Sequence, residues 1–199
     1  MEQRIILASG SMARKALLER VGVAFETSGH DVDESAIAAS MPVGHVDGEA
    51  LSLALSRAKA LDVSRRHPGG LVIGSDQVCT CENRIFNKPG TREQAVRDLQ
   101  ALRGKTHQLF SAVAVAQDGK ILFEVCEHAD MTLRLFSDSF IEHYLDMAGE
   151  DVLWCCGVYQ IERHALLLFD GMVGREDVIM GMPMLPLLAF LRQQGILEV

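Results

Sequence analysis

Two long strand-like segments around one turn dipeptide constrain the fold more than any other feature of this sequence. Residues 106–116 and 120–135 have strand-like patterns, and they flank Asp118-Gly119. An Asp-Gly pair between two such segments is typical of a tight hairpin turn, because both residues tolerate positive φ. The chain is therefore expected to contain a long antiparallel hairpin.

The first half of the sequence alternates between strand and helix patterns. Ser11 is placed to cap a helix that stops at Gly22. Its inward face is expected to consist of Ala13, Leu17, Leu18 and Val21. A longer helix over 48–66 follows the 3.6-residue period, and the Pro-Gly-Gly at 68–70 breaks it. The remaining segments are strands over 4–8, 23–28 and 71–76, and a polar loop with "DVDES" at 31–35.

Hairpins become more frequent in the second half. Residues 77–86 indicate a small hairpin with Glu82-Asn83 near its tip, and Thr91 with Gln94 forms a capping box. The other expected elements are the Thr91-capped helix to about Leu102, closed by Gly104, a helix from Ser137 or Ser139, two short strands around Arg163-His164, and a last helix from Pro183 or Pro186 to Gly195. Without a linker or repeat, this order predicts one α/β domain over 1–199 with a mixed sheet, arranged in two lobes around a cleft.

Composition limits the partners of the protein. The 199 residues carry a formal net charge of −8. A general nucleic-acid binder usually has a basic face, so no stable nucleic-acid complex is expected. An acidic protein can still bind a small anion if its cations converge in one pocket.

The cysteines and the apolar runs indicate the cellular compartment in which the protein is expected. There are five cysteines, none in a CxxC spacing, which favours buried, inert thiols in a reducing cytoplasm. The N-terminus has no secretory apolar region, and no apolar run approaches the roughly 20 residues of a membrane span. We therefore expect a cytoplasmic protein that does not enter a membrane.

The stretch "LASGSMARK" at 7–15 allows two interpretations. A strand that leads directly into a helix points free backbone N–H groups into the turn, and these favour an anion. The hydroxyls of Ser9 and Ser11 and the guanidinium of Arg14 would add donors for phosphate oxygens. The alternative is an ordinary helix cap followed by solvated cations, which this stretch alone favours.

Acidic residues and lysines supply the other candidates. Asp76 ends the apolar run "LVIGSD", where α/β sheets place ligands, so it could hold a metal or deprotonate water; it could also cap a turn. "DVDES" could add a metal ligand or remain a solvated loop. Lys59 and Lys88 could neutralise phosphate or lie on the surface. The histidines show no ligand spacing, and no Walker A, GxGxxG, HExxH or GxSxG motif occurs.

Taken together, these pieces resemble the Maf family of nucleoside triphosphate pyrophosphatases. The resemblance runs in order from residue 4 to about 190, so it covers nearly the whole chain. It rests on "LASGSMARKALLE", Asp31-Val-Asp33-Glu34, Lys59 in "ALSRAKA", "IGSDQVC", Lys88-Pro89, "GKTHQ" at 104–108 and the G-x-P of "MGMPMLPLL".

The resemblance implies a fold, an activity and a set of roles. The fold is an elongated mixed sheet flanked by helices around a central cleft, and the reaction cleaves a nucleoside triphosphate between its α- and β-phosphates. It implies a divalent cation, Mg²⁺ or Mn²⁺, and a homodimer. The roles it implies are phosphate binding by Ser9, Ser11 and Arg14, charge neutralisation by Lys59 and Lys88, base or metal-linked chemistry by Asp76, and metal support by Glu34.

Several positions depart from the family pattern and concern the base. Met12 stands where proline is usual, Ala13 where Arg or Trp occurs, and Glu162 where glutamine is common. Gln77 after Asp76 resembles the branch that acts on 7-methyl-GTP. Two other hypotheses stay open beside the enzyme. One is a non-catalytic nucleotide-binding regulator of cell division, with a role in septum formation; the other is an unrelated α/β binding domain.

Overall fold

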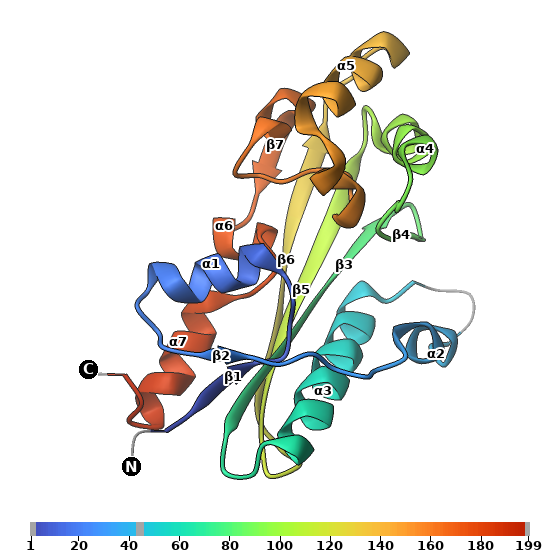
Figure 1. Cartoon of the computed structure of the whole chain (residues 1–199). Coiled ribbons are helices and arrows are strands. Elements are labelled where there is room, and N and C mark those ends of the chain that lie inside the picture. Colours follow the sequence, from blue (N-terminus) through green and yellow to red (C-terminus); the bar gives the residue numbers. More distant parts are fainter. Residues whose placement is uncertain (1–2, 43–45, 198–199) are drawn as a thin grey trace.

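The computed structural model describes residues 3–42 and 46–197, and within this part the chain forms one mixed sheet (Figure 1). The strand order is β2-β1-β3-β5-β6-β7, and β4 pairs with β3. Strands β1 and β2, and β1 and β3, are parallel, whereas the other pairs are antiparallel. The strands are β1 (Ile5–Leu7), β2 (Glu26–Thr27), β3 (Leu71–Cys81), β4 (Arg84–Phe86), β5 (Thr106–Gln117), β6 (Lys120–Leu133) and β7 (Phe169–Val173).

Helices flank this sheet, as expected for the fold class. The longest, α3, packs against β3, β5 and β6. Several begin at a side-chain cap that the sequence predicts: Ser11 for α1 and Ser137 for α5 each accept a hydrogen bond from the first turn. The helices are α1 (Met12–Arg20), α2 (Glu34–Ala39), α3 (Gly48–Arg66), α4 (Arg92–Leu102), α5 (Asp138–Ala148), α6 (Glu176–Ile179) and α7 (Met184–Gln193), with 3-10 helices η1 (Glu150–Trp154) and η2 (His164–Leu168).

The long hairpin is confirmed. Strands β5 and β6 pair along almost their full lengths, and Asp118 and Gly119 have φ of +48° and +75°. The smaller hairpin joins β3 to β4 through Glu82 and Asn83, which also have positive φ. Both turns therefore have the left-handed backbone that a two-residue loop needs to match the twist of its strands.

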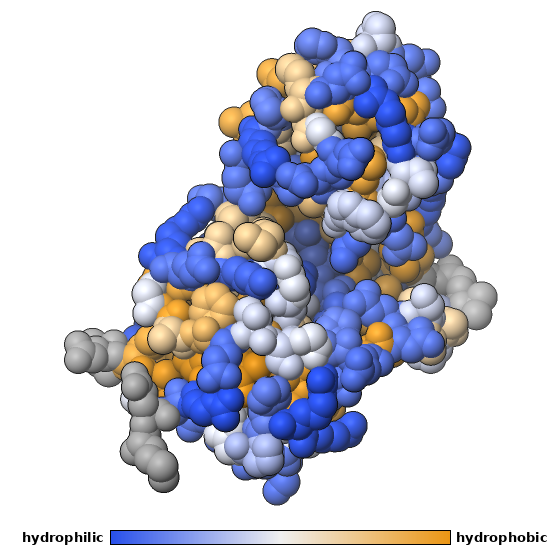
Figure 2. All heavy atoms as spheres, viewed as in Figure 1, coloured by the Kyte–Doolittle hydropathy of each residue, from blue (hydrophilic) through white to orange (hydrophobic). Residues whose placement is uncertain are grey.

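Two separate apolar cores lie at the two ends of the sheet, which gives the molecule its two lobes. One core combines β1, α1 and α7 with the β1 end of β3 and with β5, and contains Leu7, Leu18, Ile73, Val113 and Leu187. The other combines α4, α5 and the two 3-10 helices with the opposite end of the sheet, and contains Leu99, Leu109, Met131, Tyr144 and Leu168. Figure 2 shows a hollow between the two parts.

Several sequence-based expectations about elements are wrong. The strand expected to end at Asp76 continues to Cys81, so Asp76 lies within β3. Part of the polar loop forms α2, and the first of the two strands expected around Arg163-His164 is absent from the described chain, with η2 and then β7 following instead. Val21 is 43% exposed, because the helix has already ended there.

The capping box at α4 is only half formed. The hydroxyl of Thr91 accepts from the Gln94 amide, but the Gln94 side chain donates to Asp98 instead of returning to Thr91.

One glycine determines how closely α3 approaches the sheet. A Cβ at Gly74 would lie 2.4 Å from the carbonyl oxygen of Ser56 and 2.6 Å from the amide nitrogen of Ala60. Only glycine therefore allows the α3 backbone to lie directly on β3. This contact brings the side chains of α3 onto the neighbouring residues of β3.

The edge of β3 that faces β1 and β4 is open in its middle. Strand β1 pairs with β3 at 71–73, and β4 pairs with it at 79–81. Residues 74–78 therefore have no strand partner on this side within the described chain. The gap lies between the two lobes and includes Asp76.

No helix among the described residues is long and apolar enough to cross a membrane.

Candidate active site

A buried lysine joins two carboxylates at this open edge. The Lys59 ammonium on α3 lies 2.5 Å from Asp76 Oδ1 on β3 and 2.8 Å from Glu34 Oε1 at the start of α2. The side chains of Lys59 and Asp76 are 5% and 12% exposed, whereas that of Glu34 is 46% exposed. Removing a charge from water is costly unless it is paired, so these three groups depend on one another.

Only one member of the acidic stretch reaches the lysine. Asp33 caps α2, because its carboxylate accepts from the Ala36 amide at 2.9 Å. This cap turns the chain so that Glu34 begins the helix and lies toward Lys59. The backbone amide of Asp31 donates to Asp62. The "DVDES" segment therefore contributes one carboxylate to the site and uses another to build its helix.

The electrostatic surroundings of Glu34 connect further cations to the site. Burial raises the pKa of Glu34, but the hydrogen bond and charge of Lys59, with smaller contributions from Lys88 and His30, bring that pKa below its usual value. Burial and then the Lys59 charge lower the pKa of His30. Lys88, in the loop after β4, is exposed and makes no ion pair with any described residue. Its ammonium is thus available to a ligand in the cleft.

The turn after β1 brings Arg14 beside the two carboxylates. Its Nη1 donates to Ser9 Oγ at 3.3 Å, and its Nε donates to the carbonyl oxygen of Gly181 at 3.0 Å. Burial lowers the pKa of Arg14, whereas the charges of Asp76, Cys156 and Glu34 raise it. An arginine remains charged despite such a shift. The site therefore contains a desolvated cation with donors to spare.

Ser9 and Ser11 have different places in this turn. Ser9 is 7% exposed, and its oxygen also accepts from the Ser11 amide at 3.2 Å. Ser11 caps α1, as the simpler interpretation of this stretch requires. The cap leaves the amides of Met12 and Ala13 without partners within the helix. The turn is thus both a helix cap and a set of donors that an anion could use.

Gln77 and Glu162, the two candidates for base recognition, are less directly placed. Gln77 Nε2 lies within hydrogen-bond distance of Ser111 Oγ and of the carbonyl oxygens of Val178 and Ile179, at 2.9 to 3.1 Å. Its Oε1 accepts from the Cys156 thiol at 3.4 Å. Most of the hydrogen-bonding capacity of Gln77 is therefore used within the protein. Glu162 is exposed on a turn before η2, not on a strand.

Burial disfavours the thiolate form of the cysteines, two of which border the site. All five are free, and burial raises the pKa of each thiol. The pKa of Cys156 rises to about 12 through burial and the Asp76 charge, which Arg14 and Lys88 oppose. Only Cys79 and Cys81 are buried, so the expected burial is confirmed for two of the five cysteines, and their inertness stays a prediction.

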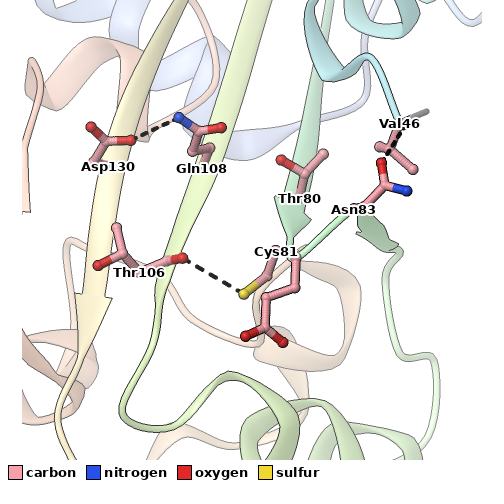
Figure 3. A pocket seen from close by; sticks show the side chains of 8 residues that line it. Val46, Thr80, Cys81, Asn83, Thr106, Gln108 and Asp130 are labelled. Carbon is pink, nitrogen blue, oxygen red and sulfur yellow. Dashed lines mark hydrogen bonds between the residues drawn. The ribbon is translucent and has the colours of Figure 1, made fainter.

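A separate pocket of about 450 Å³ lies at the far end of β3, β5 and β6 (Figure 3). None of Ser9, Arg14, Lys59 and Asp76 lines it. Within its lining, Gln108 donates to Asp130 at 3.1 Å, and the Cys81 thiol donates to the backbone carbonyl oxygen of Thr106. This pocket does not coincide with the charged cluster.

A family model described as Maf-like protein matches residues 4–194. This chain belongs to the Maf family. Two relatives cover almost all of this Maf-like chain. The "Nucleoside triphosphate pyrophosphatase" of Nitrobacter hamburgensis is 45% identical over 98% of this chain and 96% of its own length. The "7-methyl-GTP pyrophosphatase" of Mesorhizobium japonicum is 43% identical over the full length of both. Among solved structures, the Ham1 protein of Staphylococcus aureus is 13% identical, with a TM-score of 0.43 over 66% of this chain and 72% of its own.

The donor set of the Maf-like chain fits the divalent cation that the family implies. Glu34 and Asp76 direct one carboxylate oxygen each to a single point, which the Lys59 ammonium occupies. No group of three His, Cys, Asp or Glu side chains in the described residues could hold a metal by itself. Magnesium commonly takes one or two carboxylates and completes its shell with water and substrate phosphates. Because Lys59 takes one oxygen of each carboxylate, a cation would bind the second oxygen of Glu34 and of Asp76, neither of which makes a hydrogen bond to a described residue.

Sequence reasoning missed the groups that hold these residues in place. Ser75, Ser111 and Gly181 make buried hydrogen bonds that link β3 and β5 to the segment after β7. The G-x-P motif that begins at Gly181 was noticed in the sequence of the Maf-like chain, but it did not indicate that the Gly181 carbonyl contacts Arg14 and Ser75.

Proposed function

We propose that this chain is a nucleoside triphosphate pyrophosphatase, which hydrolyses the bond between the α- and β-phosphates and releases a nucleoside monophosphate and pyrophosphate. The observation that carries the proposal is the Lys59 ammonium between Glu34 and Asp76, at an open strand edge beside Arg14. Phosphoryl chemistry requires charge neutralisation and a positioned water more than a covalent partner. The activities named for the two relatives support the same assignment.

The proposed mechanism assigns the cations to the phosphates and a carboxylate to the water. Arg14, Ser9 and the free amides at the start of α1 bind phosphate oxygens, with Ser11 shaping that turn. Lys88 approaches from the other lobe and neutralises the triphosphate. Lys59 has three N–H donors and uses two of them on carboxylates, so one remains for a phosphate oxygen.

Asp76 is the proposed base. Its Oδ1 is bound to Lys59, while its Oδ2 makes no hydrogen bond to a described residue and can accept a proton from water. Glu34 and Asp76 are the residues that would hold Mg²⁺ or Mn²⁺. A bound divalent cation would neutralise charge on the phosphate oxygens and orient the water.

Within this activity, 7-methyl-GTP is the proposed preferred substrate. Support comes from Gln77, which resembles that branch of the family, and from the name of the relative from Mesorhizobium japonicum. Methylated guanine is cationic, and Glu162 could supply a negative charge only if its turn lies against the bound base. We further propose a homodimer that acts in the cytoplasm, where the five free thiols would stay reduced.

The test is a pyrophosphate-release screen with Mg²⁺ or Mn²⁺, comparing kcat/KM for 7-methyl-GTP, GTP, dTTP and UTP. We expect 7-methyl-GTP to lead, and a clear lead for dTTP or UTP would refute that substrate while leaving the activity intact. The Asp76→Asn variant should lose on the order of 10² to 10⁴ in rate. Asp98→Asn is its matched control, because Asp98 is also a buried carboxylate, 3% exposed, but lies on α4.

The regulator hypothesis makes the opposite prediction. A non-catalytic nucleotide-binding regulator of cell division would bind these nucleotides with no pyrophosphate release above that of Asp76→Asn. That result would reject the pyrophosphatase assignment.

A further inference from the structure

One backbone carbonyl, that of Gly181, lies within hydrogen-bond distance of donors on two sides of the site. Arg14 Nε donates to it at 3.0 Å from α1. Ser75 Oγ on β3 lies 2.9 Å from it and 2.8 Å from the carbonyl oxygen of Ala112, so the single hydroxyl proton of Ser75 is shared between these two acceptors. Ser75 is completely buried and immediately precedes Asp76. The same strand therefore places the catalytic carboxylate and contacts the group that holds the arginine.

The backbone at Gly181 lies against the guanidinium. Its φ is +100°, a conformation that L-residues rarely adopt, and a Cβ at this position would lie 3.5 Å from Arg14 Nη2. The preceding turn is fixed as well. The carbonyl oxygen of Val178 accepts from the Gly181 amide and from the Ser111 hydroxyl. The Gly181 carbonyl is thus a rigid acceptor, not part of a free loop.

These contacts leave a defined part of the guanidinium for a ligand. Nε is bound to Gly181 and Nη1 to Ser9, whereas Nη2 makes no hydrogen bond to a described residue. Arginine recognises phosphate through a planar fork, so its orientation decides whether two oxygens can be bound at once. An arginine held through Nε presents its outer edge in one direction only.

We propose that Ser75 and Gly181 are positioning residues that aim Arg14 at the phosphates of the substrate. Ser75 fixes the Gly181 carbonyl, and the carbonyl fixes the guanidinium. The inference rests on the proposed function, because it takes Arg14 to bind phosphate. It adds a link from the interior of β3 to a cation 61 residues earlier in the chain.

The experiment is a double-mutant cycle on the affinity for inorganic tripolyphosphate, measured by calorimetry with Mg²⁺. This probe needs neither a base nor turnover. We expect Ser75→Ala to weaken binding about fivefold, as for one hydrogen bond, and to have no further effect once Arg14→Ala is present. Ser64→Ala is the matched control: Ser64 is also a buried serine, but its hydroxyl accepts from the Gly119 amide at the turn between β5 and β6, so any effect should be equal in both backgrounds.

The outcomes separate this inference from the proposed function. The positioning role would be overturned if Ser75→Ala weakens binding equally in both backgrounds, or if either Ser75→Ala or Arg14→Ala has no effect on binding. It would also be overturned if the wild-type protein does not bind tripolyphosphate. Normal coupling in a protein that releases no pyrophosphate from any nucleotide would instead reject the pyrophosphatase assignment. If Ser75→Ala does not fold, Gly181→Ala completes the same cycle, because a side chain at a φ of +100° strains the backbone that carries the carbonyl.

Discussion

Replacing Lys59 by methionine should separate the stabilising role of this lysine from its catalytic one. The substitution keeps a long side chain in α3 but removes the ammonium that contacts Asp76 at 2.5 Å and Glu34 at 2.8 Å. Asp76 would then be a carboxylate, 12% exposed, without its partner. Breaking a buried pair costs about 3–5 kcal/mol, whereas the half-exposed Glu34 adds at most about 1 kcal/mol.

We therefore expect Lys59→Met to lower the free energy of unfolding by about 3 kcal/mol at pH 7. For a chain of this size the midpoint of thermal unfolding should fall by about 6–12 °C. The assay is urea unfolding followed by circular dichroism, with the thermal midpoint as a second measurement. Lys88→Met is the matched control. Lys88 is an exposed lysine of the same cleft and pairs with no carboxylate in the described part of the chain, so its loss should change stability by no more than about 0.5 kcal/mol.

Adding Asp76→Asn to Lys59→Met tests directly whether the unpaired Asp76 carboxylate causes the loss of stability. If the cost arises from an unpaired carboxylate, the double variant Lys59→Met with Asp76→Asn should be more stable than Lys59→Met alone. Both lysine variants should lose pyrophosphate release, by about 10²-fold or more, but only Lys59→Met should lose stability. A loss below about 1 kcal/mol in Lys59→Met, or no recovery in the double variant, would refute the reasoning that Asp76 depends on Lys59.

Three further predictions concern the scaffold. Gly74→Ala should destabilise the protein by more than about 2 kcal/mol in urea unfolding, because its Cβ would push α3 off β3; a normal midpoint would contradict this close contact. His107 is completely buried against Tyr159, and burial lowers its pKa to about 4, so the unfolded state binds more protons between pH 4 and 6.5. Stability from this group should be complete above pH 6.5 and decline by about 3 kcal/mol toward pH 4, and His107→Gln should show a correspondingly shallower pH dependence of unfolding. Tyr144→Phe should cost about 1–3 kcal/mol, because it leaves the buried carbonyl of Val158 without its donor at 3.0 Å; an unchanged unfolding midpoint would exclude that contribution.

The sequence predicted elements well where the deciding interactions are local. The Asp118-Gly119 hairpin, the Ser11 cap and the bounds of α3 depend on backbone sterics and on hydrogen bonds over a few residues. The strand containing Asp76 was cut short, because a buried strand that continues through polar residues resembles a strand followed by a turn. The same limitation produced a loop where Asp33 caps α2.

The candidate site was predictable as a set of residues but not as an arrangement. Matching motifs in order selected Arg14, Lys59 and Asp76 from the printed sequence, since each motif carries the residue types that phosphate chemistry needs. Nothing local indicates that Lys59 would bind both carboxylates, or that Gln77 would use its amide within the protein.

By itself, the sequence determined the family, most of the strands and helices in their order, and the charged groups available for catalysis. Only the tertiary structure decided that β1 and β4 leave the middle of β3 open, and that Arg14 is held by a carbonyl 167 residues away. The physical reason is the distance along the sequence between the interacting residues. Caps, turns and periodicity are fixed by interactions within a few residues, whereas a contact between distant segments forms only when the packing of whole lobes offsets the entropy of closing the chain between them.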